Sequence, residues 1–208
     1  MGSTLKVDNI VGTSGTSAPI TLSGDTATLS GTGVVFPAGG TGNPISIAIL
    51  ADQKPDGTQG GTFTAGAWRT RDLKTTAISD PDSIVSSIQS STAETQSDGS
   101  NMGHSFTLAA GTYLIEYSAP AFDTDAHQAK LYDITGSADL NFGTSEHSGS
   151  GDSTSTRSIG KFIHTITSAN VYEIRHYAET TRSGAGFGLA SASSNIEVYT
   201  MVTITKLK

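Results

Sequence analysis

Asp123, Asp125 and His127 have side chains and a spacing that suit metal binding. In the run Asp123-Thr-Asp125-Ala-His127, alternate residues bring two carboxylates and an imidazole to one side of an extended segment or loop. Carboxylate oxygens are the ligands that Ca²⁺ prefers, so Asp123 and Asp125 are candidate calcium ligands. The set lacks the distant glutamate that closes a calcium loop, and a solvated turn with aspartate caps explains the same residues. We therefore expect no cofactor, with Ca²⁺ as the open alternative.

Other catalytic chemistry finds no matching motif. The absence of cysteine from the sequence excludes a thiol nucleophile and a thiolate metal site. Gly149-Ser-Gly-Asp lacks the second glycine of a nucleophile elbow, and Gly184-x-Gly-x-Gly188 precedes a predicted strand where a dinucleotide fingerprint requires a helix. A carboxylate pair for glycan cleavage is recognised only in space. We expect the protein not to be an enzyme.

The histidines do not show the spacing of a zinc site. The five residues, at positions 104, 127, 147, 164 and 176, contain no His-x-x-x-His pair. We expect them at strand surfaces or interfaces. One hypothesis places His164 and His176 together across a seam between subunits.

The single tryptophan is flanked by two arginines, residue types that dominate binding hot spots. The candidate recognition surface comprises Trp68, Arg69, Arg71, His147 and Arg182. In the alternative interpretation, Trp68 is packed in the core and the arginines pair with Asp72 or with a neighbouring subunit.

Composition excludes further classes of partner. A net charge of −7 argues against nucleic-acid binding, which needs a basic surface. No run of about 18 apolar residues is present, so we expect no membrane insertion. The N-terminal Met-Gly-Ser-Thr-Leu-Lys-Val is not followed by an apolar segment of secretory-signal length, and we expect synthesis in a cytoplasm.

From residue 45 onward, the alternation of apolar residues is typical of half-buried strands. Tyr113, Ile115 and Tyr117 share one face of a strand that follows the Ala110-Gly111 turn. We expect further strands at 45–49, 62–73, 105–109, 126–134, 159–166, 171–180, 187–190 and 196–206. In the last of these, Ile196, Val198, Thr200, Val202 and Ile204 are predicted to share one face. Many short strands with frequent turns indicate an all-β antiparallel jelly-roll sandwich.

The segments between these strands are rich in glycine and serine. Residues 94–104, 136–156 and 182–187 are predicted to be exposed loops suited to recognition. Residues 83–89 are open to interpretation as a helical turn.

Residues 1–44 differ from the rest and form a predicted extended N-terminal arm. Thr21-Leu-Ser-Gly recurs as Thr28-Leu-Ser-Gly, which favours short extended pieces separated by glycine turns. So few apolar residues cannot offset the ordering entropy of the arm, and we expect it to order against a partner. The candidate anchor residues are Leu5, Val7, Ile10, Val11, Ile20, Leu22 and Leu29.

Several segments carry a resemblance to a known family. Phe106-Thr-Leu-Ala-Ala-Gly-Thr-Tyr-Leu-Ile-Glu-Tyr-Ser-Ala-Pro120 and the final strand are similar to the C1q/TNF-like jelly roll as found in bacteriophage tail and virion proteins. Lys6-Val-Asp-Asn-Ile-Val11 resembles the N-termini of marine-phage and cyanophage fibre proteins. The resemblance implies domains 1–44 (arm) and 45–208 (jelly roll), and a non-enzymatic homotrimer on the virion surface.

Two functions remain open under this resemblance. In the first, a tail-fibre-type trimer binds host surface glycan or protein while the arm docks to other virion proteins. In the second, the trimer decorates the capsid and the arm clamps coat subunits. A C1q-like module of a bacterium outside any virus would need export, for which no signal is visible.

Overall fold

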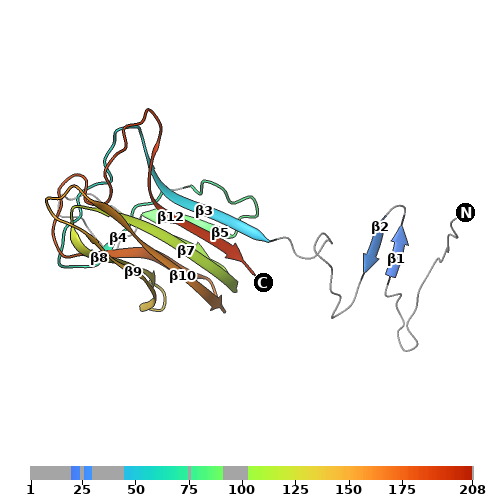
Figure 1. Cartoon of the computed structure of the whole chain (residues 1–208). Coiled ribbons are helices and arrows are strands. Elements are labelled where there is room, and N and C mark those ends of the chain that lie inside the picture. The colour runs from blue at the N-terminus through green and yellow to red at the C-terminus, as the bar shows by residue number, and fades with distance from the viewer. Residues whose placement is uncertain (1–19, 24–25, 30–44, 75, 91–102, 208) are drawn as a thin grey trace, which may run out of the picture. The chain divides into compact units, whose positions relative to one another are not determined.

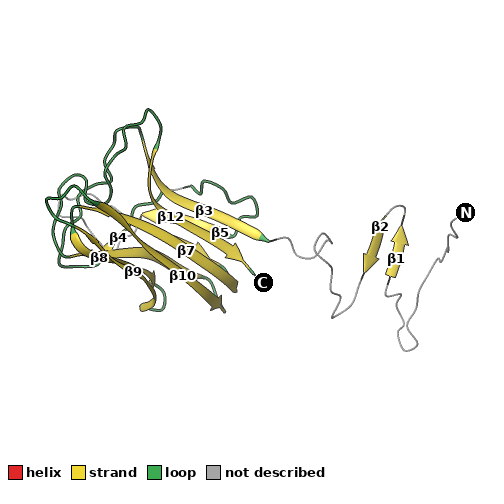
Figure 2. Cartoon of the chain, in the orientation of Figure 1, coloured by secondary structure: helices red, strands yellow, loops and turns green. Residues whose placement is uncertain are grey.

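The computed structural model describes residues 20–23, 26–29, 45–74, 76–90 and 103–207. Every regular element in these ranges is a β-strand, as Figure 2 shows. The chain divides into two compact units, Met1–Pro44 and Ile45–Lys208, which are described separately. Among the described residues, no helix is long and apolar enough to cross a bilayer.

The first unit contains a β-hairpin of two four-residue strands. Strand β1 (Ile20–Ser23) pairs antiparallel with β2 (Thr26–Leu29), and Thr21 lies opposite Thr28. The two repeated Thr-Leu sequences therefore lie in strands that pair with each other. Of the candidate anchors, Ile20, Leu22 and Leu29 lie in this hairpin, whereas Leu5, Val7, Ile10 and Val11 lie outside the described residues.

The body consists of two antiparallel sheets (Figure 1). The four-stranded sheet has the order β10 (Ser155–Ile166), β7 (Gly111–Phe122), β12 (Glu197–Lys206) and β3 (Ser46–Lys54). The six-stranded sheet has the order β5 (Val85–Ser90), β6 (His104–Leu108), β11 (Asn170–Ala178), β8 (Asp125–Asp133) and β9 (Ala138–Ser148). Its sixth strand, β4 (Arg69–Thr70), pairs with β11.

The strand order identifies the sandwich as a jelly roll. With β4 and the edge strand β5 set aside, the remaining strands β3 and β6–β12 can be counted as one to eight. The sheets then read 1-8-3-6 and 2-7-4-5, which is the double Greek key of a jelly roll. The all-β jelly-roll prediction is confirmed.

Side-chain alternation builds the core between the sheets. Tyr113, Ile115 and Tyr117 of β7 are buried, as their period of two predicts. Tyr117 reaches across the sandwich, where its hydroxyl donates to the Asn141 backbone oxygen at 3.0 Å. Its ring lies over Gly160 of β10, and a Cβ at Gly160 would lie 2.0 Å from the Tyr117 Cζ. Only glycine leaves room for this ring.

A β-bulge makes one predicted face wrong. The register between β12 and β3 shifts between Val198 and Met201. After the bulge Val202 and Ile204 point inward, but before it the buried residues are Glu197 and Tyr199, and Ile196 is 61% exposed. The extra residue reverses the alternation, so Ile196 and Val198 do not share the face of Val202.

Three other strand predictions are corrected. Residues 83–89 contain strand β5, not a helical turn, because β6 offers a free edge there. The predicted loop 136–156 contains the eleven-residue β9, whose polar composition suits a largely solvent-exposed edge strand. The predicted strand 62–73 is reduced to β4 and a bridge between Phe63 and Arg182, and 187–190 forms no strand. Residues 91–102, which hold most of the predicted loop 94–104, lie outside the described ranges.

We predict that Gly160→Ala destabilises the fold by about 1–3 kcal/mol, because the added methyl group meets the Tyr117 ring. Urea unfolding measures the change. In a Tyr117→Leu background the same substitution should cost less, since the ring that it meets is gone. Equal costs in both backgrounds would contradict this account of the packing.

Candidate recognition site

Trp68 lies in an aromatic row on the outer face of the six-stranded sheet. Its ring is tilted against Tyr177 of β11, with centroids 5.8 Å apart, and against Phe142 of β9, at 6.0 Å. Phe142 is 51% exposed and Tyr177 is 38% exposed, whereas Trp68 is half-buried between them. The row Tyr177–Trp68–Phe142 therefore presents two accessible rings held by a third.

Charged side chains beneath the row are paired. The Lys130 Nζ lies 4.0 Å from the centre of the Trp68 ring and 2.5 Å from Asp139. Arg175, beside it on β11, pairs with Glu173 and lies over the Tyr132 ring. Trp68 covers Lys130, which is why this lysine is buried. The interpretation of Trp68 as a core residue is wrong, since it packs on the outside of a sheet.

Arg71 does not belong to a recognition surface, which corrects the prediction for this residue. Its side chain is only 1% exposed, and its guanidinium donates to Thr200 Oγ1 at 2.7 Å, to the Pro120 oxygen at 3.1 Å and to the Phe187 oxygen at 2.8 Å. Burial lowers the pKa of Arg71 to about 9, so it stays protonated at neutral pH. Asp72 pairs with Lys54 at 2.8 Å, not with an arginine.

Arg69 is half-buried, and its Nε donates to the Thr64 oxygen at 3.2 Å. It lies on β4 opposite His176, on the strand that carries Trp68 to the sheet. The three residues Trp68, Arg69 and Arg71 are therefore not one surface, because the chain passes from the outer face into the interior within four residues.

Two histidines form a buried pair next to Arg71. The His127 Nδ1 lies 2.9 Å from the His176 Nε2, and the His127 Nε2 lies 2.7 Å from Thr156 Oγ1. Burial lowers the pKa of His127 to about 4 and places the pKa of His176 well below its usual range, and the charge of Arg71 adds to both effects. His164 packs against Phe162 and Tyr172 instead. His176 is fully buried within the body, so it does not reach a seam between subunits where the hypothesis placed it with His164.

Asp123 and Asp125 hold the loops at one end of the sandwich. Asp125 accepts from the Ser150 backbone at 2.7 Å and from Thr180 Oγ1 at 2.5 Å, and these hydrogen bonds lower its pKa. Asp123 accepts from the Gly151 backbone and pairs with Arg182 at 3.0 Å. Both aspartates adopt a left-handed φ of 58°.

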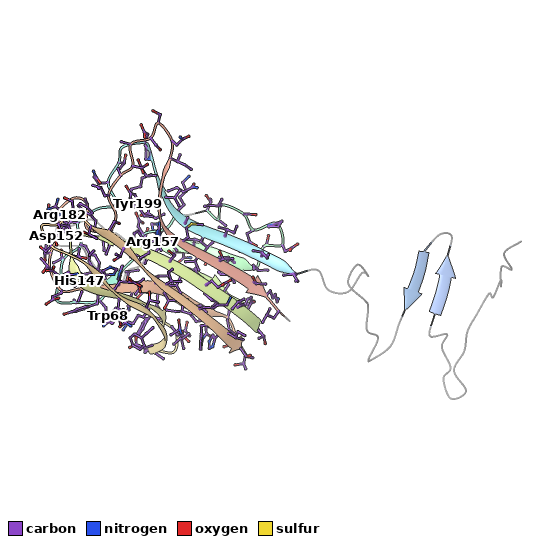
Figure 3. The ribbon with its side chains drawn as sticks, viewed as in Figure 1. Trp68, His147, Asp152, Arg157, Arg182 and Tyr199 are labelled. Atoms are coloured by element: carbon purple, nitrogen blue, oxygen red, sulfur yellow. The ribbon has the colours of Figure 1, made fainter. Side chains whose placement is uncertain are left out.

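These contacts favour the structural interpretation of the two aspartates. A guanidinium beside Asp123 repels a cation, and no group of three metal-type ligands occurs among the described residues. Figure 3 labels Arg182, Asp152 and His147 at this end of the body. The exposed His147 lies 4.0 Å from Asp125, so His147 and Arg182 both belong to this loop cluster and not to the Trp68 row.

The outer face of the four-stranded sheet is apolar. Cross-strand rows bring together Ile159, Ser118 and Met201, and then Ile163, Leu114, Thr205 and Ile47. Ile163 is 62% exposed and Ile159 is 55% exposed. Between the two rows lies the Lys161–Glu116 pair at 2.7 Å, and at one end of the face Arg157 donates to Ser118 Oγ at 3.1 Å. The sequence predicts that a trimer buries one apolar face rich in tyrosine and isoleucine, but it singles out none of these residues, although Ile159 and Ile163 lie on one side of a predicted strand.

Comparison with known proteins bears on the fold. No family model matches the chain, and no curated protein matches it. The globular domain of zebrafish complement 1qA protein is 12% identical, with a TM-score of 0.44 over 78% of this chain and 98% of that one. Murine APRIL is 11% identical, with a TM-score of 0.42 over 78% of this chain and 99% of that one. The strand order itself makes the body an antiparallel jelly roll.

We predict that Arg71→Ala destabilises the body by about 3 kcal/mol or more, because three hydrogen-bond acceptors lose a charged, buried donor. Thermal or urea unfolding measures the loss. Lys74→Ala, which removes an exposed cation three residues away, should change stability by no more than about 0.5 kcal/mol. Similar losses of stability for the two variants would contradict the stabilising role of the Arg71 hydrogen bonds.

We predict that stability falls as pH decreases from 6.5 towards 4. The unfolded histidines bind protons from pH 6.5 downward, whereas the folded pair does not, so acid favours unfolding. The His127 contribution between pH 7.5 and pH 5 is about 2 kcal/mol. Urea midpoints at these pH values should differ less in His127→Gln than in the unmodified protein. A midpoint that does not respond to acid would refute the prediction.

Proposed function

We propose that the chain is a non-enzymatic, homotrimeric protein of a phage virion surface, which attaches the particle to its host in the manner of a tail fibre. The observation that carries the proposal is the exposed apolar outer face of the four-stranded sheet. The viral setting is supported by the sequence resemblance of the arm and of the final strands to phage fibre proteins.

The apolar face supports self-association. A contiguous apolar surface on an isolated domain indicates an interface. The net charge of −7 on each copy opposes the association of two copies. The exposed isoleucines and the Lys161–Glu116 pair add no net negative charge to this face, so the face suits contact with a second copy of itself. A closed ring of three copies buries this face in every subunit and leaves no free patch.

The remaining surfaces support attachment. Burial of the four-stranded sheet in a trimer leaves the aromatic row on the opposite sheet exposed. The loop cluster of Asp123, Asp125, His147 and Arg182 lies at one end of the sandwich, where polar side chains are accessible. Such surfaces allow recognition without disturbance of the sheets.

Capsid decoration is the second candidate. It is favoured by the length of the arm, since 44 residues suffice for a clamp and make a short shaft for a fibre. In this role the trimer covers a threefold position of the capsid and the arm lies along coat subunits.

We predict that Ile163→Asp dissociates the trimer, because a charge replaces the most exposed isoleucine of the two cross-strand rows. Sedimentation at micromolar concentration should give three chain masses for the unmodified protein and one for the variant. Leu189→Asp, which changes an equally large exposed apolar residue in a loop, should remain trimeric. A monomeric unmodified protein would remove the basis of the proposal.

The viral role has its own test. Gold-labelled antibody against the purified protein should mark the tails of the phage particles that carry it in electron micrographs, with a few labels per particle. Labels spread in large numbers over the capsid would select decoration, and particles without label would exclude both roles.

A further inference from the structure

We propose that a shallow hollow between β8, β9 and β11 binds a neutral pyranose glycan. The inference rests on the proposed attachment function and names the ligand class and the residues that would recognise it. The hollow lies on the outer face of the six-stranded sheet and is lined by Ala126, His127, Gln128, Ser145, Glu146 and Tyr177.

The cross-strand register brings these residues together. Gln128 of β8 lies opposite Ser145 of β9 on one side and opposite Tyr177 of β11 on the other. Glu146 follows Ser145 on β9 and lies opposite the inward-facing His127, so its side chain is on the inner side of the sheet. The polar groups and the ring thus stand on three adjacent strands, which makes their spacing rigid.

One wall of the hollow is an aromatic ring with an accessible surface. Tyr177 is 38% exposed, and Trp68 packs against it at 5.8 Å, so the ring is held in place before a ligand arrives. Sugar rings present C–H groups on one face, and these pack against aromatic rings, whose faces carry partial negative charge. A rigid aromatic side chain loses little conformational entropy on binding.

The polar lining has hydrogen-bonding capacity that the fold does not use. Gln128 Nε2 donates to the Gly143 oxygen at 2.9 Å and to Ser145 Oγ at 3.3 Å, which fixes the amide group. Within the described ranges, the Tyr177 hydroxyl takes part in no hydrogen bond, and the Gln128 Oε1 is likewise available. A sugar carries adjacent hydroxyls that donate to such acceptors.

Charge selects an uncharged ligand. Lys130 and Arg175, the nearby cations on the same face, are paired with Asp139 and Glu173. The hollow therefore offers no unpaired lysine or arginine among the described residues, on a protein whose net charge is −7. A sialylated or sulfated glycan is repelled, whereas a neutral hexose or N-acetylhexosamine is not.

The test is binding of the full chain to immobilised neutral oligosaccharides of hexose and N-acetylhexosamine, with sialylated forms and a quaternary ammonium ligand alongside. We expect the neutral glycans to bind and the sialylated forms not to bind. Tyr177→Ala should weaken binding about tenfold or more, and Gln128→Ala should weaken it by a smaller factor. Gln128→Ala removes the amide of the hollow and leaves the aromatic row in place, so it still tests the site if Tyr177→Ala perturbs the row.

Two matched controls change similar groups elsewhere. Leu189→Ala truncates an exposed apolar residue, and Asn195→Ala removes an exposed amide, so neither should alter binding. The inference is overturned if no neutral glycan binds, if only the sialylated or the ammonium ligand binds, or if both site variants bind as the unmodified protein does.

Host cells separate this inference from the function on which it rests. If the protein binds cells equally well before and after enzymatic removal of their neutral glycans, attachment stands and the glycan site falls. If it binds the immobilised glycans but no cells, the glycan site stands and attachment falls.

Discussion

The guanidinium of Arg71 is the interaction on which one end of the sandwich depends. Where the two sheets separate, the interior contains backbone oxygens of Pro120 and Phe187 and the hydroxyl of Thr200, and Arg71 donates to all three. Buried acceptors without donors are costly, so a single planar donor group allows β7, β12 and the loop before Leu189 to meet. The centre of the Phe187 ring lies 4.3 Å from the guanidinium carbon of Arg71, so the ring packs against the guanidinium.

The charge of Arg71 also disfavours protonation of the two buried histidines beside it. Both His127 and His176 remain neutral beside it, because protonation would add a second buried cation. The neutral pair joins β8 to β11 through the interior, beneath the hollow that His127 helps to line. The polar interior and the outer surface of the six-stranded sheet are therefore connected through one side chain.

The two outer faces of the sandwich divide the work of the molecule. The four-stranded sheet carries aliphatic side chains and one neutral ion pair, a composition suited to permanent burial against identical copies. The six-stranded sheet carries aromatic rings, paired charges and free hydrogen-bonding groups, a composition suited to reversible contact with a polar ligand. The proposed self-association and the proposed recognition therefore use opposite faces of the sandwich.

The sequence by itself determined the fold class, because alternation, glycine turns and the absence of cysteine are local properties. Tyr113, Ile115 and Tyr117 were identified as one buried face from their spacing alone. The hairpin in the arm likewise follows from a repeat that is visible in the sequence.

Only the tertiary structure decided where the functional side chains lie. Trp68 and Arg71 are three residues apart, yet one covers an outer face and the other is buried, since the chain enters the interior after β4. The bulge in β12 exchanged the buried and exposed residues before Met201, and local alternation cannot reveal such a shift in register. The aromatic row and its hollow come from β8, β9, β11 and the segment before β4, so pairing between strands distant in sequence creates them.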